Sequence, residues 1–116
     1  MAHQEAVPGF GHVVYHSRDP RADRVLEFVS ELSAGNQALA VAEQVRQTVQ
    51  RHGGPFPNID FALGSLATVT GMTRSAGETI FTVARCAGWI AHALEEYKHP
   101  TRFRMRASYI GSTGSA

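Results

Sequence analysis

The stretch PGFGHVVYHSRDPR, residues 8–21, decides how this chain is organised. Its two glycines, Gly9 and Gly11, can adopt positive φ and let another group approach the backbone closely. They therefore predict a tight loop, and this loop carries His12. Taken alone, a Gly-rich turn with a surface histidine explains the loop better than a binding site does.

The end of the same stretch predicts the start of a helix. Asp19 is a favourable N-cap and Pro20 suits the first helical position, which puts Arg21 in the first turn. Free N–H groups and the helix dipole at such a start attract anions. A histidine and an arginine held in this way are typical of a site for a small carboxylate.

Length and composition limit the possible classes. The chain has 116 residues, of which 43% are hydrophobic, and this fits one domain with a real core. A net charge of +1 gives no strong field for nucleic acid or an anionic membrane. The one cysteine, Cys86, excludes an internal disulfide and fits a reducing cytosol, so we expect a cytoplasmic protein. No apolar run reaches about 18 residues, and residues 1–5 do not resemble a signal peptide.

Apolar spacing predicts an all-α chain of about four helices. We expect them over residues 21–34, 36–51, 58–72 and 77–98. Asn36 and Asn58 are the expected N-caps of the second and third helices, and Ser75 with Glu78 matches a capping box before the fourth.

Several apolar residues are expected to face the core. In the first helix they are Val25, Leu26, Phe28, Val29 and Leu32. In the fourth helix they are Val83, Ala87, Ile90 and Leu94, and we also expect Trp89 and His92 to be packed.

Pro100 is expected to end the last helix. Residues 1–100 would then form the helical domain, and residues 101–116 an extended C-terminal arm with a flexible tail. The arm has arginines at alternate positions, Arg102, Arg104 and Arg106. A nucleic-acid interface on this row is disfavoured by the low net charge and the few aromatic residues nearby.

Four motifs occur in order along the chain. They are GFGH at residues 9–12, DPR at 19–21, PNIDF at 57–61 and ARCAGWIAH at 84–92. This set closely resembles the C-terminal part of the citrate synthase family, which includes 2-methylcitrate synthase. The resemblance covers roughly residues 7–111 and implies the all-α small domain of that fold.

The resemblance implies a condensation of acetyl-CoA or propionyl-CoA with oxaloacetate, by way of an enol and hydrolysis of citryl-CoA. His12 matches the histidine that polarises the oxaloacetate carbonyl, and Asp60 the base that takes a proton from the acyl group. From spacing alone, Asp60 is more simply an acid that complements the dipole of its helix. A weakly acidic thioester α-proton does require a carboxylate base placed within hydrogen-bond reach.

Further residues match the family's substrate contacts. Arg21, Arg85 and Arg104 match the three arginines that hold the carboxylates, and bidentate arginine forks suit a dicarboxylate. In the family dimer, the arginine matched by Arg104 reaches into the neighbouring subunit's site. His16 stands where the family has a basic residue that contacts coenzyme A. The resemblance implies no permanently bound cofactor, since the acyl-CoA is a cosubstrate.

The sequence also departs from the family. A long N-terminal portion, which forms most of the large domain and carries a second catalytic histidine, does not precede the GFGH motif. We therefore expect this chain to need a large domain from elsewhere. Val13 and Met105 replace an arginine and a proline of the family pattern, which weakens the expectation of coenzyme A binding.

Two further hypotheses follow. The chain could be a non-catalytic, truncated module that pairs with full-length synthase subunits, and exposed helix faces would favour a dimer or other self-association. A histidine metal site is disfavoured, because only His12 and His16 have suitable spacing and both fall on a loop.

Overall fold

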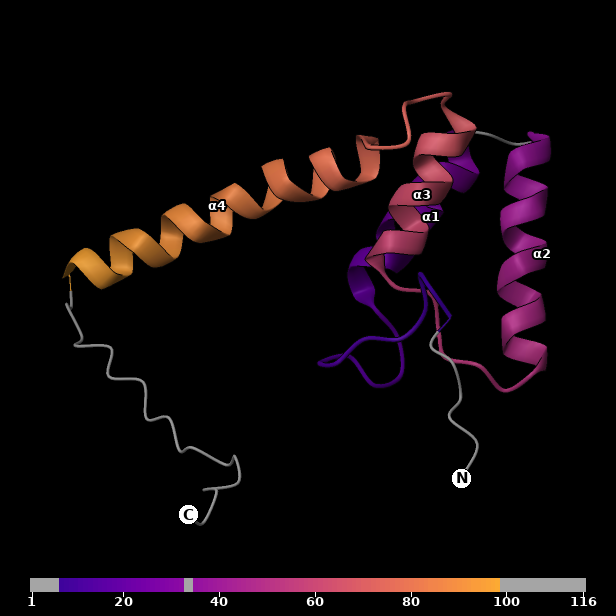
Figure 1. Ribbon diagram of the computed structural model, residues 1–116, viewed down its shortest axis with the longest axis horizontal. Coiled ribbons are helices and arrows are strands. Elements are labelled where there is room, and N and C mark those ends of the chain that lie inside the picture. Colours follow the sequence, from indigo (N-terminus) through magenta and orange to yellow (C-terminus); the bar gives the residue numbers. More distant parts are fainter. Residues whose placement is uncertain (1–6, 33–34, 99–116) are drawn as a thin grey trace, which may run out of the picture. The chain divides into compact units, whose positions relative to one another are not determined.

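A computed structural model describes residues 7–32 and 35–98, and within these ranges the chain is helical with no strand (Figure 1). The helices are α1 (Pro20–Leu32), α2 (Gln37–Arg51), α3 (Ile59–Val69) and α4 (Ala76–Lys98). The all-α fold class is confirmed. No helix of the described part has the length and apolar character that crossing a membrane requires. The predicted arm, the domain boundary near residue 100 and Arg104 lie outside the described residues.

The predicted caps of the first three helices are confirmed. The Asp19 carboxylate accepts the backbone N–H of Arg21 at the start of α1. The Asn36 side chain accepts a backbone N–H of α2, and that of Asn58 accepts two from α3. These local bonds satisfy N–H groups that have no partner inside their helices.

Two helix ends differ from the prediction. Helix α3 ends at Val69, followed by Thr70 as C-cap, rather than near residue 72, because the chain turns through Gly71 at φ +70°. Before α4, the Ser75 hydroxyl lies 3.3 Å from the Thr73 hydroxyl rather than capping Glu78.

The described residues divide into two units, the first ending at Ala84 and the second beginning at Arg85. In the first unit α3 packs against α1, and α2 packs on α3 (Figure 1). The core is small and is built largely from short side chains, which let the helices approach closely. Its buried apolar residues are Phe10, Ala22, Val29, Ala62, Leu63 and Ala67.

Predictions of burial on two helices, α1 and α4, are wrong. Phe28 and Leu32 of α1 are exposed, because α3 covers only the side of α1 that carries Ala22 and Val29. In α4 no residue is buried, and Trp89 is 54% exposed. The expected buried line of α4 and the packed His92 are likewise exposed. The apolar spacing of a helix marks a face that could be buried, but burial requires a second element to cover it.

The opening loop is bonded to the segment that precedes α3. Gly11 donates its backbone N–H to the Phe56 carbonyl at 2.8 Å, and Asn58 donates its own to the Gly9 carbonyl at 2.9 Å. Between these bonds, Phe10 forms an antiparallel bridge with Pro57 and is itself buried. The loop therefore has a fixed position relative to the start of α3.

We predict that Gly9→Ala destabilises the protein by about 1 kcal/mol more than Gly35→Ala. Both glycines have positive φ, +83° and +87°, so both substitutions strain the backbone. A Cβ at Gly9 would also meet the Cβ of Phe61 at 3.1 Å, whereas one at Gly35 would meet nothing within 4 Å. Urea unfolding of the two variants measures the difference, and equal losses would contradict the close approach of loop and helix.

Candidate functional site

The carboxylate of Asp19 joins the starts of two helices. It is fully buried and accepts N–H groups from Arg21 at the backbone, Nε (2.9 Å) and Nη2 (2.8 Å). It also accepts the backbone N–H of Ile59, the first residue of α3, at 3.2 Å. The hydrogen bonds from Arg21 hold the pKa of Asp19 below its ordinary value, although burial acts in the opposite direction. Asp19 is therefore a buried anion whose charge is balanced by Arg21 and whose oxygens accept hydrogen bonds from Arg21 and Ile59.

The guanidinium of Arg21 is contacted along one edge by Asp19 and on one face by the Tyr15 ring. Asp19 occupies Nε and Nη2, and the Tyr15 ring lies 5.1 Å from the guanidinium carbon. The hydrogen bond to Asp19 raises the pKa of Arg21, and the charge of Asp60 acts in the same direction. Nη1 makes no hydrogen bond within the described residues, and the side chain is 38% exposed. This oriented cation can donate to an incoming carboxylate.

The imidazole of His12 is oriented by its own loop. Its Nδ1 accepts the backbone N–H groups of Val14 at 3.1 Å and Tyr15 at 3.3 Å. A neutral imidazole that accepts at Nδ1 carries its proton on Nε2. The His12 side chain thus presents an N–H donor on the side away from the loop backbone, which suits a hydrogen bond to a carbonyl oxygen.

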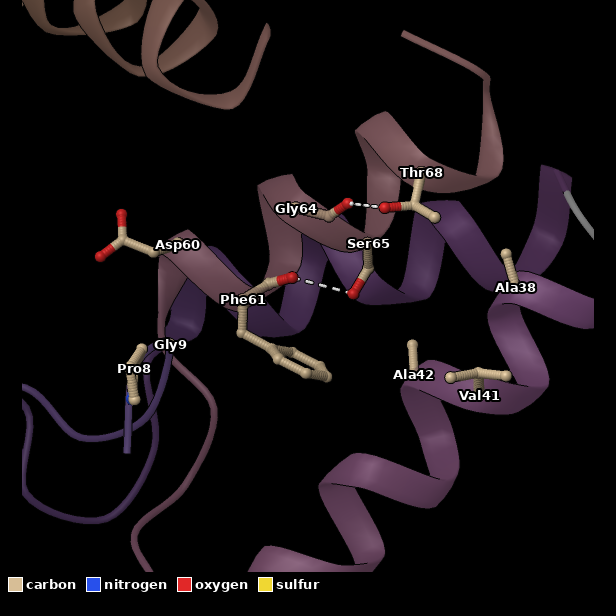
Figure 2. Close-up of a pocket in the computed structure, with 10 residues that line it drawn as sticks. All are labelled: Pro8, Gly9, Ala38, Val41, Ala42, Asp60, Phe61, Gly64, Ser65 and Thr68. Carbon is tan, nitrogen blue, oxygen red and sulfur yellow. Dashed lines mark hydrogen bonds between the residues drawn. The ribbon is translucent and has the colours of Figure 1, made fainter. Parts of the chain in front are cut away.

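Asp60 lies in the first turn of α3 and is exposed. It borders two cavities of the first unit. One, of about 480 Å³, lies between the opening loop, α2 and α3 and is lined by Pro8, Gly9, Ala38, Val41, Ala42, Asp60, Phe61, Gly64, Ser65 and Thr68. Figure 2 shows the Asp60 carboxylate at the edge of this largely apolar cavity, directed away from Phe61 and Ser65. The other, of about 280 Å³, lies between α3 and the first turns of α4 and includes Leu63, Arg74, Glu78 and Phe81.

The structure brings together three of the residues selected from the sequence. The Asn58 side chain caps α3, which carries Asp60, and donates to the Gly11 carbonyl next to His12 at 2.9 Å. Asp19 attaches the start of α1, which carries Arg21, to the same end of α3. A proton acceptor, an N–H donor and a cation are therefore held at one end of the first unit.

Of the other predicted site residues, Arg104 lies outside the described part of the chain. His16 is exposed on the loop before α1. Arg85 belongs to the second unit. Its guanidinium lies beside Gly88 of the same helix, so that a Cβ added at Gly88 would come within 3.1 Å of Nη1. Among the residues that the structure describes, no three or more side chains gather as potential metal ligands.

Sequence reasoning missed two contributions to the site. The bond from Ile59 to Asp19 joins residues 40 positions apart, so no local pattern signals it. The ring contacts of Tyr15 with His12 and Arg21 depend on the path of a loop. A loop has no repeating sequence pattern from which such contacts can be predicted. The close spacing of Asp19 and Arg21 did offer a signal for their ion pair.

We predict that Asp19→Asn lowers the free energy of unfolding at pH 7 by about 1–3 kcal/mol. Because the pKa of Asp19 is lower in the folded chain than the unfolded value of about 3.9, its ionised form stabilises the fold above that pH. This contribution is lost as the pH falls through the folded pKa.

Urea unfolding at pH 7 and pH 3 measures this effect. The difference in the free energy of unfolding between the native chain and Asp19→Asn should be smaller at pH 3 than at pH 7. Asp23→Asn is the control, because its pair with Arg18 is exposed and 3.5 Å long, and it should cost little at either pH. A gap of the same size at both pH values would argue against the buried anion.

We also predict that neutral His12 has its proton on Nε2. Two-dimensional ¹⁵N NMR of the imidazole ring distinguishes the two tautomers by the shifts of the ring nitrogens. A neutral ring protonated on Nδ1 would show that the backbone bonds from Val14 and Tyr15 do not orient the side chain.

Comparison with known proteins identifies the family of this chain. The family model described as citrate synthase, C-terminal domain, matches residues 1–106. The chain is 35% identical to a citrate synthase of Haloferax volcanii, over 92% of this chain and 29% of that protein. It is 32% identical to citrate synthase 2 of Bacillus subtilis, over 93% of this chain and 30% of the relative.

A third relative is 2-methylcitrate synthase 2 of Corynebacterium glutamicum, 32% identical over 96% of this chain and 30% of that protein. The chain thus spans about three tenths of the length of the curated relatives it matches. With the family model and these relatives matching nearly its whole length, this chain belongs to the citrate synthase family and corresponds to its C-terminal domain.

Proposed function

We propose that this chain forms the small-domain side of an acyltransferase site that condenses acetyl-CoA or propionyl-CoA with oxaloacetate. The observation that carries the proposal is the joint anchoring of His12, Arg21 and Asp60 at the start of α3. The names of the relatives, citrate synthase and 2-methylcitrate synthase, support the same reaction class.

In this proposal oxaloacetate binds through its charge and its ketone. Nη1 of Arg21 is available to a substrate carboxylate, because Asp19 occupies the opposite edge of the guanidinium. The Nε2–H of His12 donates to the ketone oxygen and polarises the carbonyl carbon for attack. Arg85 and Arg104 are proposed as further carboxylate contacts on the family resemblance alone.

The acyl-CoA reacts at its α-carbon. The Asp60 carboxylate, which lies in the first turn of α3, removes an α-proton as general base. The resulting enol carbon attacks the polarised ketone and forms the new carbon–carbon bond of citryl-CoA. Water then cleaves the thioester and releases citrate, or 2-methylcitrate, and free CoA. The donor to the enol oxygen is the second histidine of the family, which belongs to the large domain.

The proposal also names coenzyme A and a second protein part as partners of this chain. His16 is the weak candidate for a contact with coenzyme A. A large domain, or a full-length synthase subunit, would complete the site, and a homo-oligomer fits the family. The single cysteine still favours a cytoplasmic location.

A second candidate function is a non-catalytic module that pairs with intact synthase subunits. The specific observation in its favour is the exposed apolar surface of α4, which includes Val83, Trp89, Ile90 and Leu94. Such a surface suits association with another protein whether or not the chain reacts with substrate.

We predict that Asp60→Asn reduces turnover at least a hundredfold, because a positioned general base contributes about 10²–10⁴ in rate. The full chain would be fused in place of the matching segment of the Haloferax volcanii relative, so that the rest of the site is present. Release of free CoA thiol, with oxaloacetate and each acyl-CoA in turn, measures the rate.

Asp23→Asn is the matched control, since it makes the same change at an exposed acid of α1. It should keep the rate of the unaltered fusion. Turnover that survives Asp60→Asn would refute Asp60 as the base. A fusion that is inactive throughout, while the free chain copurifies with an intact synthase, would favour the pairing module instead.

A further inference from the structure

We propose that Tyr15 is a positioning residue whose ring sets the spacing between His12 and Arg21. The inference rests on the proposed function, because it assigns Tyr15 a task in the binding of oxaloacetate. It adds a residue that the sequence motifs did not select.

Tyr15 contacts His12 in two ways. Its backbone N–H donates to Nδ1 at 3.3 Å, and its ring centroid lies 4.9 Å from that of the imidazole, with the planes inclined at 37°. The first contact orients the ring nitrogens, and the second fixes where the imidazole lies. Substitution of the Tyr15 side chain would remove only the second contact.

The same ring also contacts Arg21. The guanidinium carbon lies 5.1 Å from the ring centroid, within the range of a cation–π interaction. Asp19 already holds Nε and Nη2 in the guanidinium plane. The Tyr15 ring lies against the face of the group, so two different contacts fix the direction of Nη1, which makes no hydrogen bond within the described residues.

Apart from the backbone bonds of the loop, few side chains near His12 are buried. Val13 and Val14 are 91% and 69% exposed, so neither anchors the loop by burial. Between residues 12 and 18, Tyr15 alone is partly buried. The ring of Tyr15 is therefore a side chain that contacts both the loop histidine and the arginine of α1.

This connection matters for a small keto-acid. In oxaloacetate the ketone carbon is bonded directly to a carboxylate carbon, so an N–H donor for the ketone and a cation for the carboxylate must be held at a short, fixed separation. Displacement of either group weakens binding and orientation together. Tyr15 contacts both, which is why we assign it this role rather than a general role in packing.

The test compares Tyr15→Leu with Tyr15→Phe in the fusion that carries the full chain. Leucine removes the aromatic face and should raise the KM for oxaloacetate roughly tenfold and lower kcat. The KM for acyl-CoA should stay unchanged, because the ring contacts of Tyr15 within the described residues are with His12 and Arg21, both assigned to oxaloacetate. Phenylalanine keeps the face and should restore both constants to near those of the unaltered protein.

Tyr97→Leu is the matched control, because it makes the same change at an exposed tyrosine of α4. It should leave the KM for oxaloacetate as it is. Equal effects of the leucine and phenylalanine variants at Tyr15, or a parallel rise in the KM for acyl-CoA, would overturn the inference. Failure of the unaltered fusion to turn over would instead overturn the proposed function, and the inference with it.

Discussion

The site depends on one buried charge. An isolated carboxylate inside a protein is costly, and Asp19 is tolerated because four N–H groups and one cation surround it. Those partners come from the first turn of α1 and from Ile59 at the start of α3. By satisfying this anion, the fold fixes the two helix starts against each other, and with them the positions of Arg21 and Asp60.

The opening loop is attached to the same place by backbone bonds. Its glycines allow it to run close to α3, and Asn58 both caps that helix and binds the loop. His12 then needs only local support, which the backbone of its own loop and the ring of Tyr15 provide. Backbone contacts thus position the loop and the helix starts, while the side chains of His12 and Asp60 remain exposed.

Structural features that depend on contacts within a few residues could be predicted from the sequence. Features that depend on contacts between distant segments could not. The caps Asp19, Asn36 and Asn58 were predicted because a cap is a contact within a few residues. The exposure of Trp89 was not, because it depends on what covers α4 rather than on helical spacing. The motifs selected His12, Arg21 and Asp60, whereas the contacts that join them run between distant segments, which no local sequence pattern signals.

The proposed function requires that His12 and Arg21 bind one keto-dicarboxylate between them. A crystal structure of the fusion with oxaloacetate bound tests this most directly. We predict that the ketone oxygen lies within about 2.6–3.2 Å of Nε2 of His12, with the adjacent carboxylate on Nη1 of Arg21. Oxaloacetate bound away from Arg21, or a His12 ring turned so that Nδ1 faces the ligand, would contradict it.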